Sequence, residues 1–380
     1  MTGESQPTGA ERSQGADPQA GYDLSGYRLE RRGVLMEPVP GEPNQAWGVL
    51  NPATARDRNG DLWIFPRLVA EHNMSRIGKA RVRIDAAGDP IGTDPPTVAL
   101  EPTQQWEKNA RTSGTEDPRI SWIPTLDHYV MSYTAYGPLG PRIGIAISTD
   151  LDHWERLGPL AFDFQADLAT DLNLYANKDA LWFPEPVTAP DGRRAYAVLH
   201  RPTWNLDEMS HYGYVATPAV VTDPRPGMWV SYADAADVEA DIRHIVRVAQ
   251  HRQVAIGRHP WEQVKIGGGT PPLRTDAGWL VLHHGVSGIY VPGEDLQQHL
   301  NYSAGLMILD PDNVSHVVAR SEHPLLTPDT TEERAGLVPN VVFPTAIDDR
   351  GNGSADVFYG MADSRIGWAR LTYPTDRIER

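Results

Sequence analysis

Cysteine is absent from this chain of 380 residues, which excludes disulfides, thiolate metal sites and a cysteine nucleophile. Lysine is scarce, because only Lys79, Lys108, Lys178 and Lys265 stand against thirty arginines. Acidic residues are in excess: 34 lysines and arginines against 50 aspartates and glutamates give a formal net charge of −16. This balance argues against a nucleic-acid partner and against an anionic membrane, since both need a basic face.

Long apolar runs are also missing, and no window reaches the roughly eighteen apolar residues of a membrane span. Residues 1–25 are rich in glycine, serine, glutamine, proline and acidic residues, which predicts a disordered tail. The tail lacks the basic start and apolar run of a secretory signal. We therefore expect a cytoplasmic protein in which residues 26–380 form one domain.

Short aromatic and β-branched segments dominate the rest of the chain and predict an all-β fold. They come in five pairs, and most second members open with a similar glycine-containing motif. Recurrent units of this kind favour a five-bladed β-propeller over a β-sandwich built from ordinary hairpins. The first members are 62–65, 128–135, 195–199, 279–282 and 357–359, and the second members are 77–80, 143–146, 212–216, 303–306 and 366–369.

One helix is expected between the third and fourth pairs. Val238, Ile242, Ile245 and Ala249 recur at helical spacing, with acidic residues early and basic residues late. The pattern predicts an inserted amphipathic surface helix over 234–250, which covers a sheet, borders a pocket or mediates self-association.

Polar residues interrupt several of the expected strands. Pro118 biases Asp117 toward an extended backbone at a strand entrance, where it can form a structural ion pair or act as a general acid. A glycine run at 266–269, followed by two prolines, is typical of backbone close to a ligand. His283 and His284 point to opposite faces of a strand, so they are a poor pair of ligands and we expect no metal site.

Taken in order, these motifs resemble glycoside hydrolase family 130, the mannoside phosphorylases and related β-mannosidases. The matching pieces are 51–53, 75–78, 116–119, 143–150 with Trp154, 177–179, 183–185, 200–202, 266–269 through 284–285, 340–343 and 359–363. They extend over nearly the whole chain after the tail. The resemblance implies a five-bladed β-propeller, in agreement with the five pairs.

The resemblance also implies roles for individual residues. Asp117 would be the single catalytic acid, protonating the departing glycosidic oxygen with the sugar's own 3-hydroxyl as relay. The sugar-binding residues would be Asn51, Arg67, Arg119 and Asp363. The phosphate-binding residues would be Arg142, Lys178, Arg201, His284, Tyr302 and Ser75. Inorganic phosphate would be a co-substrate, and no cofactor is expected.

The favoured function is an inverting phosphorylase that cleaves a β-mannoside with phosphate to give α-mannose 1-phosphate. A β-mannosidase of the same fold is the alternative, because Glu71, Glu185 and Glu262 could supply the second carboxylate that hydrolysis needs. A sugar-binding propeller without catalysis ranks lower. So does a five-bladed furanosidase, whose aspartate nucleophile would fall near Asn51.

The chain departs from the family pattern at three places. Arg81–Asp85 stands where a Ser-x-Asp-Gly segment is usual, and Pro66 replaces the tyrosine that usually precedes Arg67. An insertion over about 205–253 contains the expected helix. These departures leave the linkage, the acceptor sugar and assembly into a homo-oligomer undetermined.

Overall fold

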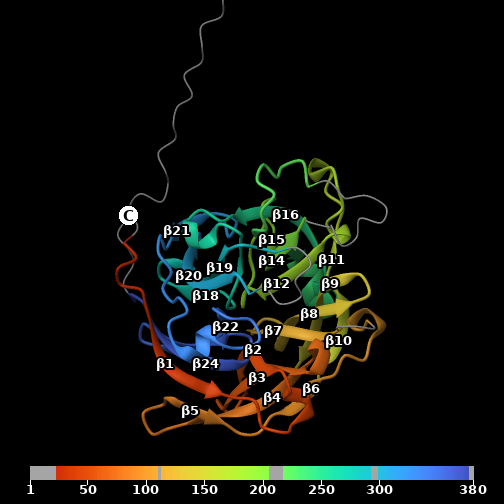
Figure 1. Ribbon diagram of the computed structural model, residues 1–380. Coiled ribbons are helices and arrows are strands. Elements are labelled where there is room, and N and C mark those ends of the chain that lie inside the picture. Colours follow the sequence, from red (N-terminus) through yellow and green to blue (C-terminus); the bar gives the residue numbers. More distant parts are fainter. Residues whose placement is uncertain (1–22, 110–112, 205–216, 292–297, 376–380) are drawn as a thin grey trace, which may run out of the picture.

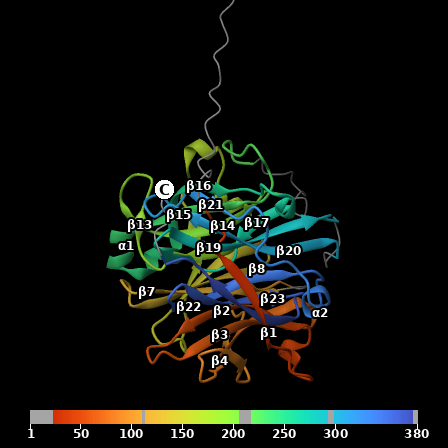
Figure 2. The ribbon, with the colours of Figure 1, turned by 90° about the vertical axis from the view of Figure 1, so that its left-hand side faces the viewer.

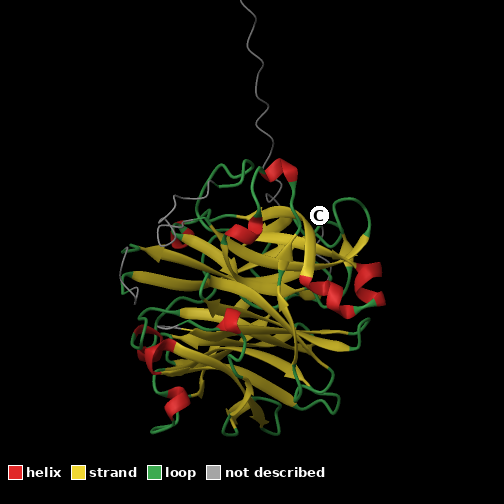
Figure 3. Cartoon of the chain, turned by 90° about the vertical axis from the view of Figure 1, so that its right-hand side faces the viewer, coloured by secondary structure: helices red, strands yellow, loops and turns green. Residues whose placement is uncertain are grey.

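The computed structural model describes residues 23–109, 113–204, 217–291 and 298–375, and these residues form an all-β protein (Figure 1, Figure 3). The tail expected at 1–25 lies outside the described residues except for its last three. Helical segments in the described residues are short: η1 (Pro43–Gln45), η2 (Glu71–Asn73), η3 (Gln105–Glu107), η4 (Ala166–Leu168), η5 (Leu172–Leu174), α1 (Ala235–Ala240), η7 (Ile242–Val246), η8 (Pro260–Glu262) and α2 (Thr331–Arg334). Within these ranges, no helix has the length and apolar character needed to cross a membrane.

The strands group into five antiparallel units of consecutive strands. The first unit contains β2 (Gly48–Arg56), β3 (Leu62–Ala70) and β4 (Met74–Ile84), with β5 (Pro90–Thr93) and β6 (Thr97–Leu100) paired to β4. The second unit contains β7 (Ser113–Ile123), β8 (His128–Gly137), β9 (Gly140–Ser148) and β10 (Glu155–Pro159). These two units join into one sheet where β4 pairs in parallel with β7.

The third unit contains β12 (Ala176–Trp182), β14 (Arg194–Thr203), β15 (Met228–Asp234) and β16 (Arg247–Ala255), with β11 (Ala161–Phe162) and β13 (Val187–Thr188) at its edges. The fourth contains β17 (Lys265–Gly268), β18 (Leu273–Thr275), β19 (Gly278–Gly288), β20 (Leu300–Leu309) and β21 (Val317–Arg320). The fifth contains β22 (Val342–Gly351), β23 (Ser354–Met361), β24 (Arg365–Thr372) and, from the other end of the chain, β1 (Arg28–Met36). The expected segments that are described all lie in strands, while 212–216 lies outside the described residues.

Five apolar clusters lie between the units, and each cluster joins two units that follow one another. One residue from each side represents each cluster: Phe65 with Met131 between the first and second units, Val130 with Tyr196 between the second and third, Leu199 with Val281 between the third and fourth, and Leu306 with Val357 between the fourth and fifth. A further cluster contains Ile64 of the first unit and Phe358 of the fifth. Each unit therefore packs on two neighbours, and the last packs on the first.

Three of the units each contain a fully buried glutamate, which connects a short helix to two strands of its unit. Each glutamate is the third residue of its helix and accepts backbone N–H groups at the helix start, which would otherwise have no partner. Each glutamate also binds a tyrosine or histidine on the second strand and an arginine on the outer strand. The three sets are Glu107 with Tyr133 and Arg156 in the second unit, Glu262 with His283 and Arg320 in the fourth, and Glu333 with Tyr359 and Arg31 in the fifth.

The recurring glycine in the third strand of these units follows from the same arrangement. A Cβ on Gly144, Gly305 or Gly367 would lie within 2.7 Å of the tyrosine or histidine ring of its unit. Only glycine leaves room for a ring there, and this explains the repeated motif in the sequence.

Strand β1 completes the fifth unit from the other end of the chain. It pairs antiparallel with β24, with Arg28 opposite Thr372 and Met36 opposite Ile366. Figure 2 shows the red β1 beside the blue strands of that sheet.

The helix expected over 234–250 was partly correct, because the segment forms two short helical pieces and then a strand in place of one long helix. Asp234 caps the start of α1, and Asp241 ends α1 and accepts the N–H of Arg243 to start the separate 3-10 helix η7. Residues from Arg247 onward form β16. Of the segment expected as an insertion at about 205–253, residues 205–216 lie outside the described residues, and β15 and most of β16 are strands of the third unit.

Candidate active site

Bulges in the first strands of three neighbouring units turn polar side chains toward one another. Asn51 on β2, Asp117 on β7 and Asp179 on β12 lie at register shifts and have φ of 41°, 46° and 57°. Asparagine and aspartate tolerate this left-handed conformation better than most residues. Because β7 contacts both β2 and β12, the three bulges lie close together.

Asp117 lies at the centre of a buried hydrogen-bond cluster. Its Oδ1 accepts from Asn51 Nδ2 at 2.9 Å and from Arg67 Nη1 at 3.1 Å. Arg67 also donates from Nη2 to Glu116 Oε1 at 2.9 Å and from Nε to Ser75 Oγ at 2.9 Å. The bulge thus brings the predicted acid together with three of the predicted binding residues.

The positive charges around Asp117 favour its ionised carboxylate over the protonated acid. Burial would raise the pKa of Asp117, but Arg67, Lys178 and Arg119 lower it below its usual range. Asp363, which follows β23 at φ 46°, has the opposite balance. Burial raises the pKa of Asp363 to about 6, because the charge of Arg67 offsets only part of the burial effect.

Arg119 supports the same bulge from the other side. Its Nη1 donates to the carbonyl of Asp117 at 2.7 Å, and its Nε donates to the carbonyl of Gly269 at 2.9 Å. The predicted sugar-binding arginine therefore ties β7 to the end of the glycine run, just after β17.

A group of cationic side chains lies on the other side of the acid. Lys178 Nζ is 3.4 Å from Glu116 Oε2, and Arg201 Nε donates to Asp179 Oδ2 at 2.6 Å. His284 Nε2 lies 3.7 Å from the same Asp179 oxygen. Burial opposes the charge of Lys178, but Glu116 raises its pKa, so this lysine stays charged at neutral pH.

Lys265 belongs to this group although the sequence analysis did not select it. Its Nζ lies 5.4 Å from the ring centroid of Tyr302, which in turn stacks near His284 at 6.2 Å. Burial, assisted by the charge of Arg201, lowers the pKa of Lys265 to about 7. Its only signals in the sequence were the scarcity of lysine and its place just before the glycine run.

The glycine run passes close to side chains of this group. A Cβ on Gly267 would lie 2.3 Å from Asp179 Oδ2, 2.4 Å from His284 Cε1 and 2.8 Å from Arg201 Nε. Glycine at this position therefore allows β17 to approach the Asp179–Arg201 pair.

Several buried polar atoms at the site have no hydrogen-bond partner within the described part of the chain. They are Asn51 Oδ1, Arg119 Nη2, Thr270 Oγ1 and His284 Nδ1. Buried polar groups are nearly always paired in folded proteins. Other orphaned atoms are scattered through the described residues, but these four lie around the bulges and the glycine run, where they could bind a ligand with hydrogen-bonding groups.

The remaining residues selected from the sequence have no hydrogen bond or ion pair with the cluster around Asp117 in the described residues. Arg142 lies on β9, and in the described residues its hydrogen bond goes to the carbonyl of Pro141 rather than to the cluster. Glu262 is occupied by His283 and Arg320, which fits a structural role. Two other candidate bases are exposed: Glu71 begins η2, and Glu185 lies 3.9 Å from Arg274.

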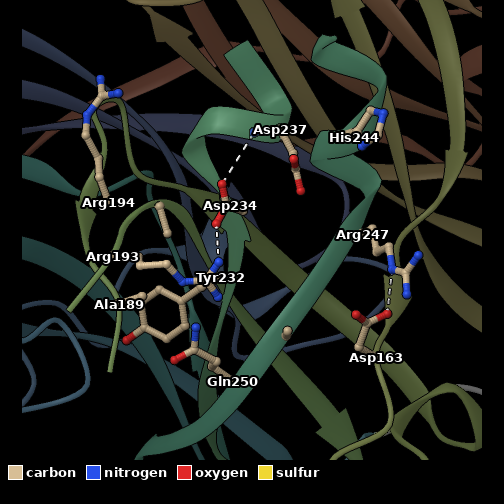
Figure 4. A pocket seen from close by; sticks show the side chains of 12 residues that line it. Asp163, Ala189, Arg193, Arg194, Tyr232, Asp234, Asp237, His244, Arg247 and Gln250 are labelled. Atoms are coloured by element: carbon tan, nitrogen blue, oxygen red, sulfur yellow. Dashed lines mark hydrogen bonds and ion pairs between the residues drawn. The ribbon is translucent and has the colours of Figure 1, made fainter. Parts of the chain in front are cut away.

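A separate pocket of about 410 Å³ lies beside α1 and β16 and shares none of these residues (Figure 4). Its arginines are balanced locally, since Arg193 pairs with Asp234 at 2.6 Å and Arg247 pairs with Asp163 at 2.7 Å. Within the described residues, the two groups of charges differ in that only the first surrounds a bulged acid; an orphaned buried polar atom occurs at the second as well, the hydroxyl of Tyr232.

The chain is similar to known proteins over most of its length. A family model described as beta-1,4-mannooligosaccharide phosphorylase, Glyco_hydro_130, matches residues 28–375. A 1,2-beta-oligomannan phosphorylase from Thermoanaerobacter sp. (strain X514) is 29% identical over 356 residues, which cover 90% of this chain and 96% of the relative. The solved beta-1,2-mannobiose phosphorylase of Listeria innocua, in complex with beta-1,2-mannobiose, has a TM-score of 0.65 at 20% identity over 91% of this chain and 96% of its own, which shows a shared fold.

Proposed function

Because the chain belongs to glycoside hydrolase family 130 and is an enzyme that acts on β-mannosides, we propose that it is an inverting phosphorylase. Inorganic phosphate would attack the anomeric carbon of the mannosyl residue as the bond from that carbon to the glycosidic oxygen breaks. The products would be α-mannose 1-phosphate and a shortened acceptor sugar. The proton would pass from Asp117, through the 3-hydroxyl of the mannosyl residue, to the departing oxygen.

The observation that carries this proposal is the cationic group beside Asp117 in a protein of charge −16. Lys178, Arg201 and Lys265 offer fixed donors to a phosphate dianion, and the orphaned His284 Nδ1 offers another polar contact. A phosphate nucleophile arrives already ionised, so the reaction needs cations and no catalytic base. Phosphorolysis is therefore favoured over hydrolysis, for which the three candidate glutamates are poorly placed.

Bound phosphate would also raise the fraction of Asp117 that is protonated and able to act as an acid. In the free protein the charge of Lys178 helps to keep the pKa of Asp117 low. A bound dianion beside that lysine would offset its charge and raise the pKa of Asp117. Binding of the nucleophile would thus help to load the proton that the leaving group needs.

The linkage is a finer question, because the names of the relatives include both β-1,4 and β-1,2 mannosides. The test is to incubate the protein with β-1,2- and β-1,4-linked manno-oligosaccharides, with and without phosphate, and to follow the products by phosphorus NMR. We expect phosphate-dependent formation of α-mannose 1-phosphate. Sugar release at the same rate without phosphate would contradict phosphorolysis and favour a β-mannosidase.

Asp117→Asn provides the matching test of the acid. The amide cannot donate the transferred proton, so kcat should fall by about 10²- to 10⁴-fold. The exposed Asp276→Asn variant serves as control and should keep full activity. Unchanged turnover in Asp117→Asn would mean that another group supplies the proton.

We also propose that the five units close into a five-bladed β-propeller with the site at its centre. The support is the cluster between the fifth and first units, together with the contacts of β2 with both β7 and β22. In that arrangement the first strands, which carry the bulges, would be the innermost strands.

A further inference from the structure

A continuous chain of buried hydrogen bonds crosses the third unit from its first strand to its last. Asn177 on β12 contacts His200 Nδ1 through its Nδ2 at 3.1 Å, and His200 Nε2 contacts Ser231 Oγ at 2.8 Å. Ser231 Oγ then contacts His251 Nδ1 at 2.8 Å, and His251 Nε2 contacts the carbonyl oxygen of Asp163 at 2.9 Å. The four side chains are at most 2% exposed.

The carbonyl at the outer end allows only one arrangement of protons along this chain. A carbonyl oxygen only accepts, so His251 must carry its hydrogen on Nε2. Burial lowers the pKa of both His251 and His200, and both rings are neutral at pH 7. His251 Nδ1 therefore accepts from Ser231, Ser231 accepts from His200 Nε2, and His200 Nδ1 accepts from the Asn177 amide.

The inner end of the chain reaches the cationic side of the candidate site. Asn177 immediately precedes Lys178 and Asp179, which hold Glu116 and Arg201 respectively. The residue opposite Asn177 is Pro202, which has no N–H to donate, and the pairing of β12 shifts register after Lys178. The backbone alone therefore fixes this segment less firmly than a regular strand.

The outer end lies at a different place on the unit. Asp163 lines the pocket of Figure 4, where its carboxylate holds Arg247 at 2.7 Å, while its backbone oxygen ends the chain of hydrogen bonds. The network thus anchors the bulge of β12 to the far edge of its own sheet.

We propose that Asn177, His200, Ser231 and His251 form a positioning relay that fixes the orientation of Lys178 and Asp179 and so sets the affinity for phosphate. This inference rests on the proposed function, because it assumes that the cationic group holds phosphate. The four relay residues act through Lys178 and Asp179 and are positioning residues. Loss of the relay should weaken phosphate binding while leaving the acid side of the site in place.

The first test removes the central hydroxyl with Ser231→Ala and measures KM for phosphate, KM for the mannoside and kcat. We expect KM for phosphate to rise about five- to tenfold, the effect of weakening one hydrogen bond, with the other two constants nearly unchanged. Ser231→Thr keeps a hydroxyl and should restore most of the phosphate affinity.

The matched control is Ser321→Ala in the fourth unit, where a buried hydroxyl accepts the N–H of Leu306 at 3.0 Å. It should leave KM for phosphate unchanged. An unchanged KM for phosphate in Ser231→Ala would overturn the relay. So would a similar worsening of kcat and of both KM values in the two alanine variants.

The second test needs neither a variant nor activity. Nitrogen-15 NMR of the histidine-labelled parent protein, assigned with His200→Gln and His251→Gln, should show both rings protonated on Nε2 and unprotonated on Nδ1 at neutral pH. A ring protonated on Nδ1 would contradict the relay. Failure of the proposed function would instead be seen as a parent protein that forms no phosphate-dependent product.

Discussion

Lys178 is expected to control the pH dependence of catalysis as well as phosphate affinity. Its positive charge lowers the pKa of Asp117, so Lys178→Met should raise that pKa. A general acid works only while protonated, and activity falls as pH rises through its pKa. The alkaline limb of the kcat/KM profile should therefore move to higher pH, while KM for phosphate rises about 10- to 100-fold.

The control for this profile is Lys108→Met, because Lys108 is an exposed lysine. It should leave both the profile and the KM for phosphate unchanged. An alkaline limb that stays fixed in Lys178→Met would show that Lys178 does not influence the acid.

Gly267 offers a steric test of the cationic group. In Gly267→Ala the new methyl group would occupy the space of Asp179 Oδ2 and His284 Cε1, and the Asp179–Arg201 pair would have to move. We expect at least a tenfold loss of kcat/KM for phosphate. Gly192→Ala is the control: the turn has open space but a φ of 83°, so the variant should lose some stability and keep full activity. Equal kinetics in the two variants would contradict the proposed arrangement of the site.

At the level of residues, the sequence motifs selected several side chains that the structure brings together, while their roles stay predictions. Asn51, Arg67 and Asp117 were selected, and they do meet. Lys265 was missed because its role depends on strands that are distant in sequence and on burial, and no local pattern reports either. Asp179 appeared only as part of a motif, since its value as the partner of Arg201 and His284 depends on the close approach of β17.

At the level of elements, the buried glutamates are expected to be important for stability. Glu262 accepts the N–H groups of Arg258 and His259, at 2.9 and 3.0 Å, as well as donors from His283 and Arg320. Glu262→Gln replaces one acceptor oxygen with an NH₂ group facing donors, so the free energy of unfolding should fall by about 2–4 kcal/mol in urea titrations.

The sign of the pH dependence gives a second check on Glu262. Burial would raise its pKa, but His283 and Arg320 lower it from 4.5 to about 2. The carboxylate therefore contributes stability above pH 4.5 that is lost as the pH falls toward 2, and the difference from the glutamine variant should narrow over that range. The exposed Glu185→Gln should change stability by less than about 0.5 kcal/mol at any pH.

The strands differ in how well the sequence predicts them. The second and third strands of the units are mostly apolar and β-branched, and the sequence predicted them with one exception. In the third unit it selected 212–216, which lies outside the described residues, and missed β15. The first strands were mostly not predicted, because proline, glycine and bulged polar residues such as Asn51 and Asp117 break the alternation. The irregularity that hides these strands also turns the polar groups inward. Over 234–250, the helical spacing predicted one helix where the structure has α1, η7 and the start of β16, and Asp241 caps the second piece separately.

For the whole molecule, pairing of β1 with β24 predicts different effects for two truncations. Removal of residues 1–36 would expose the edge of β24 and take Arg31 from buried Glu333, so the variant should aggregate or melt at a much lower temperature. Removal of residues 1–22 tests the predicted disordered tail and should leave Tm and activity unchanged. Equal melting of both variants and the parent would show that β1 contributes little.

The same pairing constrains the order in which the chain can fold during synthesis. Arg28 leaves the ribosome long before its partner Thr372. At 5–20 residues per second, about 340 residues of synthesis separate them by roughly 20 to 70 s. During that interval the earlier units can form local hairpins, but β1 has no strand to pair with until β22, β23 and β24 of the fifth unit are made. A chaperone that shields residues 28–36 on the nascent chain would therefore act on the step that completes the fold.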